Sequence, residues 1–146
     1  MILYLLRHGE AEPYGRASDD ASRALVSAGT KAVNRVAAEL APVDAVYCSP
    51  YLRARQTAEL VLSATGQQAY HLYDGLTPDS SVAALMAWLE TIKPQRLLLV
   101  AHNPLLSSLA SQLTGLPGGV ALSTANLACL DVSDFLPGGA ELLWVK

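Results

Sequence analysis

Residues 2–10, ILYLLRHGE, place an apolar run directly before an unusual polar group. Five apolar residues, Ile2 to Leu6, are followed at once by Arg7, His8 and Gly9. A short, unbroken apolar run of this kind is typical of a strand that is buried on both faces of a parallel sheet. We therefore expect a strand that carries an arginine and a histidine at its carboxyl end.

Short apolar runs alternate with segments of helical period along the rest of the chain. Further strands are expected at residues 43–48, 70–73, 96–101, 126–132 and 141–145. Helices are expected at residues 30–40, from Ser49-Pro50 to Thr65, from Ser80 or Ser81 onward, and from Pro104 to Gly115. This alternation predicts an α/β protein, a three-layer sandwich with a mostly parallel central sheet and helices on both faces. The last two strands are candidates for an antiparallel edge.

Two helix starts carry local signals. Gly29 is expected just before the helix at 30–40. Ser49 is expected to cap the second helix, with Pro50 at its first position, because these residue types favour those places.

Length and composition predict a single domain, residues 1–146, with a packed core. Hydrophobic residues make up 51% of the chain and charged residues 16%. The net charge of −3 argues against nucleic acid or an anionic membrane as a partner. Cys48 and Cys129 lie in apolar runs and are expected to be buried free thiols. With no basic leader and no apolar segment of membrane-spanning length, we expect a cytoplasmic location.

Arginines and histidines gather at the carboxyl ends of three predicted strands, where open parallel sheets bind ligands. Arg7 and His8 end the first strand, Arg53 lies in the first turn of the helix after the second, and His102 follows the strand at 96–101. Guanidinium groups and a helix N-terminus both favour a phosphate. A neutral imidazole can attack it. We therefore predict a phosphoryl site with His8 as the nucleophile, where Gly9 permits close backbone approach or an unusual dihedral angle.

Each of these residues also has a purely structural interpretation. A histidine at a strand end is ordinarily a hydrogen-bonded, half-buried side chain, and Arg53 and Arg55 could form a solvated helix face. His71 has no convergent partner and is interpreted as structural. A metal site is not favoured, because no HxH or HxxxH spacing occurs and the arginines would repel a cation. No cofactor is expected.

Three motifs, in order along nearly the whole chain, resemble those of the histidine phosphatase superfamily, which has the phosphoglycerate mutase-like fold. The first is RHGE at 7–10. In the second, SPYLRARQTA at 49–58, Arg53 matches the phosphate-binding arginine and Arg55 falls at a variable position. In the third, VAHNP at 100–104, His102 matches the second histidine. Three further features are similar to those of the SixA-type phosphohistidine phosphatases. They are the chain length and the segments SDDASRAL at 18–25 and LTPDSS at 76–81.

The resemblance implies a two-step reaction in which His8 takes the phosphoryl group and water then removes it. Arg7, Arg53 and His102 would bind the phosphoryl oxygens, and Gly9 is expected with them among the substrate-binding residues. Because the insertions of larger relatives are absent, it implies a shallow pocket that accepts a histidine-phosphorylated protein, such as a phosphotransfer domain. The resemblance also implies that SixA-type members lack the general acid found in the larger relatives. Asp74 is the nearest candidate for such an acid in this chain.

Two alternative functions are left open by the sequence. The chain could be a phosphomonoesterase for small phosphate esters that uses Asp74 or Asp79 as an acid. It could also be a phosphohistidine-binding module without catalysis.

Overall fold

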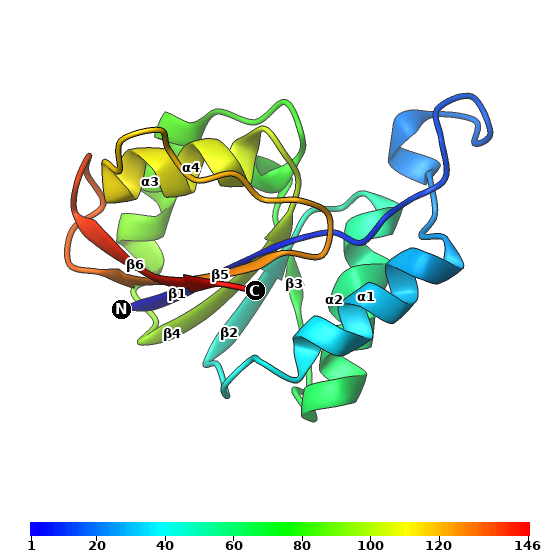
Figure 1. Cartoon of the computed structure of the whole chain (residues 1–146), viewed down its shortest axis with the longest axis horizontal. Helices are drawn as coiled ribbons and strands as arrows, with labels where there is room; N and C mark the ends of the chain where they lie inside the picture. The colour runs from blue at the N-terminus through cyan, green and yellow to red at the C-terminus, as the bar shows by residue number, and fades with distance from the viewer.

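The computed structural model describes all residues from 1 to 146 and places a six-stranded sheet between two pairs of helices (Figure 1). The strands are β1 (Ile2–Arg7), β2 (Ala45–Cys48), β3 (His71–Leu72), β4 (Arg96–Ala101), β5 (Leu127–Val132) and β6 (Ala140–Val145). The helices are α1 (Ser27–Ala37), α2 (Leu52–Thr65), α3 (Val82–Ile92) and α4 (Leu105–Thr114), with short 3-10 turns η1 (Asp20–Ser22) and η2 (Asp74–Leu76). The predicted three-layer α/β sandwich is confirmed.

The sheet has the strand order β3-β2-β4-β1-β5-β6. Strands β1 to β4 run parallel, whereas β5 pairs antiparallel with β1, and β6 antiparallel with β5. The predicted antiparallel edge is therefore confirmed. Arg7 of β1 and Ala101 of β4 are register partners, as are Cys48 of β2 and Val100 of β4. The carboxyl ends of these three strands consequently lie together at one edge.

Helices α3 and α4 cover one face of the sheet, and α1 and α2 cover the other (Figure 1). Along β1, Leu3 and Leu5 face the first pair of helices, while Tyr4 and Leu6 face the second. Burial on both faces explains why this strand has an unbroken apolar sequence rather than an alternating one. None of the helices has the length and apolar character needed to cross a membrane.

Both cysteines are buried free thiols, as expected. Cys48 lies on β2 and Cys129 on β5, and their side chains belong to the core on the α1–α2 face.

Two predicted helix starts are wrong, and each has a tertiary cause. Helix α1 begins at Ser27, so Gly29 lies inside it. A Cβ atom at Gly29 would overlap the backbone of Glu10, which shows that glycine is kept there for a close approach of two chain segments. Helix α2 begins at Leu52 with Tyr51 as its N-cap, so neither Ser49 nor Pro50 starts it.

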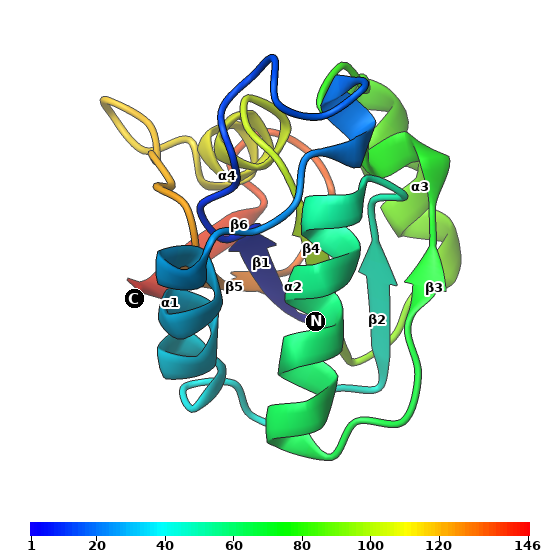
Figure 2. The ribbon, with the colours of Figure 1, turned by 90° about the vertical axis from the view of Figure 1, so that its right-hand side faces the viewer.

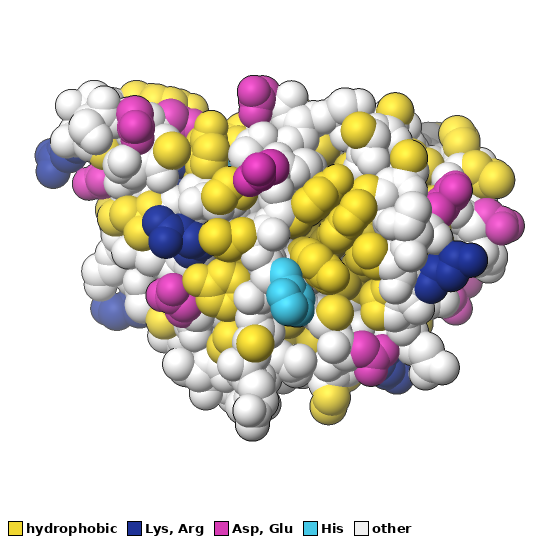
Figure 3. Space-filling view, turned by 180° about the vertical axis from the view of Figure 1, so that it is seen from behind, with side chains coloured by type: hydrophobic (Ala, Val, Ile, Leu, Met, Phe, Trp, Pro, Cys, Tyr) yellow, Lys and Arg dark blue, Asp and Glu magenta, His cyan; other side chains and the backbone are white.

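An aromatic cluster supports the β3 edge of the sheet. The ring of Tyr73 stacks on Trp88 at 3.8 Å, and Tyr47 meets Trp88 edge-on at 4.8 Å and His71 at 5.2 Å. Figure 3 shows hydrophobic side chains gathered beside a histidine on this side of the molecule. His71 thus packs among aromatic rings, in agreement with its structural interpretation.

Candidate active site

The three predicted strand ends meet at the carboxyl edge of the sheet. The backbone N–H of His8 donates to the carbonyl of Ala101 at 3.0 Å, and that of Ser49 donates to Val100 at 3.0 Å. These bonds fix the segments after β1, β2 and β4 side by side. As a result, His8 and His102 have ring centroids only 5.1 Å apart.

His8 is held in one tautomer by its backbone neighbour. Its Nδ1 lies 2.7 Å from the carbonyl oxygen of Gly9, which can only accept, so Nδ1 carries the proton. The Nε2 lone pair then faces Arg53, whose Nε–H donates to it at 3.3 Å. Burial lowers the pKa of His8 to about 4, assisted by the charges of Arg53, Arg7 and Arg23 and opposed by the bond to Gly9. At neutral pH the ring is uncharged and its Nε2 is unprotonated.

Arg53 is buried, with an exposed fraction of 3%, and all its guanidinium nitrogens are engaged. Nη1 donates to the backbone carbonyl of Asp20 at 2.7 Å, and Nη2 to the Asp20 carboxylate at 3.2 Å. The helix backbone is fixed as well, because Thr57 donates its hydroxyl to the Arg53 carbonyl at 2.8 Å. The guanidinium is therefore held beside His8 before any substrate arrives.

His102 is almost fully buried and forms a relay with Ser49. Its Nε2 lies 2.7 Å from Ser49 Oγ, and this oxygen accepts the backbone N–H of Tyr51 at 3.2 Å. Ser49 Oγ also donates to Nε2 in the tautomer of His102 that carries its proton on Nδ1. Nδ1 is buried without a partner. Burial, with the nearby charges of His8, Arg53 and Arg7, lowers the pKa of His102 to about 2, against the opposing charge of Asp20.

Arg7 joins the site from the end of β1. Its Nη1 donates to the Leu122 carbonyl at 3.1 Å, and the same carbonyl accepts the side-chain amide of Asn103 at 2.7 Å. Its Nε is buried without a partner, and burial together with the charge of Arg53 lowers the pKa of the guanidinium. Arg7 Nε–H is thus a buried donor that remains free for a bound anion, and His102 Nδ1 is a second one in the tautomer that accepts from Ser49.

Gly9 permits a close backbone approach, as the sequence predicted. A Cβ atom there would lie 2.8 Å from the Gly29 carbonyl oxygen and 2.9 Å from Val33 Cγ2. The alternative of an unusual dihedral angle is wrong, since Gly9 is not among the residues with positive φ. Its N–H donates to Thr57 Oγ1 at 3.1 Å, and its carbonyl accepts from His8. Both polar groups of Gly9 therefore position His8, and its N–H is not free for a substrate.

Sequence reasoning missed the chemical part played by Asp20 and Arg23. The Asp20 carboxylate bridges Arg53 and Arg23, with oxygen–nitrogen distances of 3.2 Å and 2.8 Å. Burial alone would raise the pKa of Asp20, but the hydrogen bonds and charges of the two arginines outweigh it and leave the pKa lowered. The loop that carries both residues arches over the N-terminal end of α2 (Figure 2). The sequence feature that could have indicated these two residues is the acidic pair followed by an arginine within SDDASRAL.

The other candidates from the sequence lie apart from this group. Asp74 is exposed in η2, and none of the hydrogen bonds of Arg7, His8, Arg53 or His102 involves it. Asp79 accepts a hydrogen bond from Thr77 at 2.8 Å. Arg55 donates to the Pro50 carbonyl at 3.1 Å.

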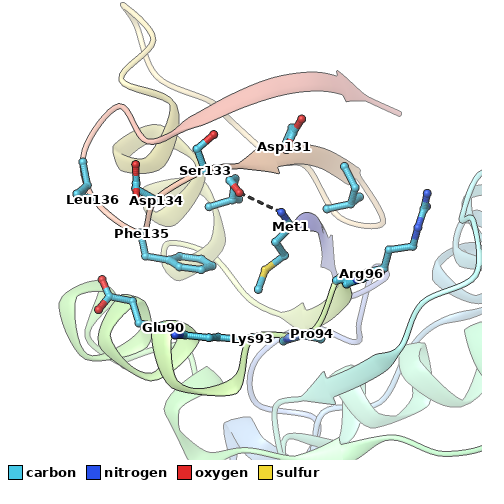
Figure 4. Close-up of a pocket in the computed structure, with 13 residues that line it drawn as sticks. Met1, Glu90, Lys93, Pro94, Arg96, Asp131, Ser133, Asp134, Phe135 and Leu136 are labelled. Atoms are coloured by element: carbon cyan, nitrogen blue, oxygen red, sulfur yellow. Dashed lines mark hydrogen bonds between the residues drawn. The ribbon is translucent and has the colours of Figure 1, made fainter.

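A hollow of about 890 Å³ lies at the opposite edge of the sheet (Figure 4). Its lining includes Met1 at the start of β1 and Arg96 at the start of β4, and the Met1 amino group donates to the Val132 carbonyl at 3.1 Å. Since it lies at the amino ends of the parallel strands, this hollow is separate from the histidine site. No group of three or more His, Cys, Asp or Glu side chains that could hold a metal ion is present in the structure.

Comparisons with known proteins agree with this geometry. The sequence profile of the histidine phosphatase superfamily (branch 1) matches residues 3–77. An uncharacterized protein of a Picosynechococcus species is 35% identical over 111 residues, which cover 71% of this chain and 67% of that protein. The phosphohistidine phosphatase SixA homolog of Haemophilus influenzae is 26% identical over 145 residues, 89% of this chain and 87% of that protein.

The structure of the protein histidine phosphatase SixA complexed with tungstate superposes with a TM-score of 0.87 and 25% identity. The match covers 100% of this chain and 96% of that one. The resemblance to SixA-type proteins and to the phosphoglycerate mutase-like fold is thereby confirmed.

Proposed function

The chain belongs to branch 1 of the histidine phosphatase superfamily, and from this premise we propose that it is a phosphohistidine phosphatase, which removes a phosphoryl group from a histidine-phosphorylated protein through a covalent intermediate on His8. One observation carries the proposal: the unprotonated Nε2 of His8 lies 3.3 Å from the Nε–H of Arg53. A nucleophile and an anion-binding fork are thus already adjacent. We further propose that residues 1–146 act as one domain, because β5 completes the sheet around β1.

In the first step, the Nε2 lone pair of His8 attacks the phosphorus atom, and the bond from phosphorus to the substrate nitrogen breaks. The substrate ring carries a proton on its other nitrogen, so it keeps the electron pair and departs as a neutral imidazole. Arg53 and the unpartnered N–H groups of Arg7 and His102 donate to the three phosphoryl oxygens, on which negative charge is spread in the transition state. Because these donors are buried and fixed, little reorganisation accompanies the reaction.

In the second step, water attacks the phosphoryl group on Nε2 of His8 and the phosphorus–nitrogen bond breaks. The proton on Nδ1 stays with the ring throughout, held by the Gly9 carbonyl at 2.7 Å. Phosphorylated His8 is therefore an imidazolium, which leaves as a neutral imidazole. Inorganic phosphate is released with the oxygen and both protons of the attacking water, and His8 returns to its starting tautomer.

The groups around His8 favour a substrate whose leaving group needs no acid. Asp20 is the carboxylate that reaches the site, and its pairing with Arg23 and Arg53 lowers its pKa, which keeps it ionised at neutral pH. An ionised carboxylate cannot protonate an alkoxide. An imidazole leaves more readily than an alkoxide, so the absence of a protonated acid beside His8 supports phosphohistidine over an alkyl phosphate ester.

The test compares kcat/KM for a histidine-phosphorylated phosphotransfer domain, an aryl phosphate and an alkyl phosphate, with no metal added. We expect a preference of roughly 100-fold or more for the phosphohistidine protein over the alkyl ester, because only the ester requires a proton donor. Asp74→Asn is the matched variant and should leave both rates unchanged.

A comparable rate on the alkyl phosphate that falls in Asp74→Asn would contradict the proposal. The protein would then be a phosphomonoesterase for small phosphate esters with Asp74 as its acid. Saturable binding of the phosphohistidine protein without turnover of any substrate would instead indicate a binding module.

A further inference from the structure

We propose that Asp20 is a displaceable anion, whose carboxylate occupies a phosphoryl-oxygen position on Arg53 in the free protein and so weakens the binding of small phosphates. It would thereby keep the affinity for inorganic phosphate, the product, low and favour its release. The inference rests on the phosphoryl-binding role proposed above for Arg53.

The position of the carboxylate on the guanidinium is the first argument. The Nε–H and one Nη2–H of an arginine point the same way and form the fork that binds two oxygens of one phosphate. In this structure Nε meets His8 Nε2 at 3.3 Å, and Nη2 meets an Asp20 carboxylate oxygen at 3.2 Å. Nε of this fork therefore faces His8, and Nη2 of the same fork already binds the Asp20 carboxylate.

Two anions cannot use this fork together. A phosphoryl group attacked by His8 would bring its oxygens next to the Asp20 carboxylate, and like charges at such short range repel. Asp20 is also close enough to His102 for its charge to influence that ring. The carboxylate must consequently leave Nη2 when a phosphoryl group binds.

Arg23 provides the place to which the carboxylate can move. The other Asp20 oxygen already lies 2.8 Å from Arg23 Nη1, and Arg23 is fixed by its Nε–H bond to the Glu12 carbonyl at 2.8 Å and by the Tyr14 ring at 4.0 Å. The Asp20 side chain is 34% exposed, so it has freedom on its solvent side. The bond from Arg53 Nη1 to the Asp20 carbonyl can remain, so only the side chain has to move.

Displacing Asp20 costs the same free energy for every phosphorylated ligand. A small phosphate has only its phosphoryl contacts to offset this cost, whereas a phosphorylated protein gains contacts around the site as well. Asp20 therefore lowers the affinity for every phosphorylated ligand by the same factor, and the net affinity stays high only for ligands with contacts beyond the phosphoryl group. It also favours release of the phosphate product.

The experiment measures the dissociation constant for inorganic phosphate by isothermal titration calorimetry in wild type and in Asp20→Asn. We expect phosphate to bind about threefold to tenfold more tightly in Asp20→Asn, a modest factor because the ion pair is partly screened by solvent. Asp19→Asn is the control, since it removes a neighbouring charge of the same loop that touches neither arginine. It should change the constant by less than about twofold.

The direction of the change in phosphate affinity distinguishes this role of Asp20 from a role in anchoring the loop. If Asp20 merely held the loop in place, its replacement would weaken phosphate binding or leave it unchanged, and either result overturns the proposal. Asp20→Ser supplies a second, shorter variant with the same expected direction, so that a folding defect of one variant does not decide the outcome. We also expect inorganic phosphate, the product, to inhibit turnover of the phosphohistidine protein more strongly in both variants than in wild type.

Failure of this inference differs from failure of the proposed function. Unchanged phosphate affinity in Asp20→Asn, with wild-type turnover of phosphohistidine, would overturn only the role of Asp20. Tighter phosphate binding in Asp20→Asn, with no turnover of any substrate by wild type, would support Asp20 and overturn the proposed function.

Discussion

Arg53 and His8 are 45 positions apart in the sequence, and their side chains form a buried hydrogen bond of 3.3 Å from Nε to Nε2. The bond places the unprotonated nitrogen of His8 against a permanent positive charge. Such an arrangement stabilises negative charge that develops beside the nucleophile, with no need for the groups to reorganise. The roles proposed for both residues follow from this contact.

Replacing Arg53 should be far more harmful than replacing Arg55, although both lie on α2. Arg53→Ala removes the guanidinium beside His8, and we expect kcat/KM to fall by about 100-fold to 1,000-fold, a typical loss for one preorganised charge-stabilising donor. Arg55 donates only to the Pro50 carbonyl, so Arg55→Ala should cost less than about fivefold. Steady-state kinetics on one phosphohistidine substrate decides the order, and the reverse order would show that the wrong arginine has been assigned.

His8→Ala should abolish turnover while the fold is retained, because it removes the atom that accepts the phosphoryl group. We expect a loss of at least about 1,000-fold in kcat, with no phosphorylated protein detected after rapid quenching with labelled substrate. The control is His71→Ala, which removes a histidine that packs against Tyr47 at the edge of the sheet. Near-normal activity in His8→Ala would exclude a covalent intermediate on this residue.

Acidification should destabilise the protein through its two buried histidines. The pKa values of His8 and His102 are lowered from 6.5 to about 4 and about 2, so as pH falls below 6.5 the unfolded chain takes up protons that the folded chain does not. The free energy of unfolding therefore falls with pH in this window, by about 1–2 kcal/mol for each histidine between about pH 7 and about pH 5.

Urea unfolding of wild type and His102→Gln across this range provides the measurement. The variant lacks one titrating group, and we expect its stability to depend less steeply on pH. The control is His71→Gln, which removes an exposed histidine. Identical slopes in wild type and His102→Gln would contradict the assigned burial effect.

Gly29→Ala should destabilise the protein, although glycine to alanine within a helix ordinarily stabilises. The added Cβ would overlap the Glu10 carbonyl oxygen and lie 2.8 Å from the Glu10 nitrogen, so the backbone must shift. We expect a loss of about 2–3 kcal/mol in the free energy of unfolding, the usual range for such overpacking. Asn34→Ala, at an exposed position of the same helix, is the control and should be close to neutral. A stabilised Gly29→Ala protein would contradict the close approach of α1 to residue 10.

The pattern of apolar residues predicted strands and helices well wherever burial requires the residues of an element to be apolar. The runs that form β1 and β4 are apolar because both faces are covered, so they could be recognised without knowledge of their partners. The start of α1 could not be recognised in this way, because Gly29 is required for the close contact with Glu10 and does not mark the end of a helix. Ser49 resembled a helix cap, but its hydroxyl is used by His102, a partner that only the folded sheet brings near.

The difference between local pattern and tertiary contact also explains which residues of the candidate site could be predicted from the sequence. His8, Arg53 and His102 each follow a strand, and parallel strands end at one edge, so their meeting follows from topology. Asp20 lies in a loop between β1 and α1, and nothing periodic marks where such a loop will cross the sheet. Its contact with Arg53 spans 33 positions and depends on the loop's own hydrogen bonds, among them the one from Arg23 to Glu12.

The central place of β1 has a consequence for how the protein is made. This strand is synthesised before both of its neighbours in the sheet, which are β4, at Arg96–Ala101, and β5, at Leu127–Val132. The apolar strand that leads into His8 is therefore paired on both sides only after more than a hundred further residues have been synthesised. Contacts of such long sequence separation slow folding and leave unpaired apolar strands exposed to aggregation. The sheet edge that leads into His8 is thus complete only after β5 has been synthesised.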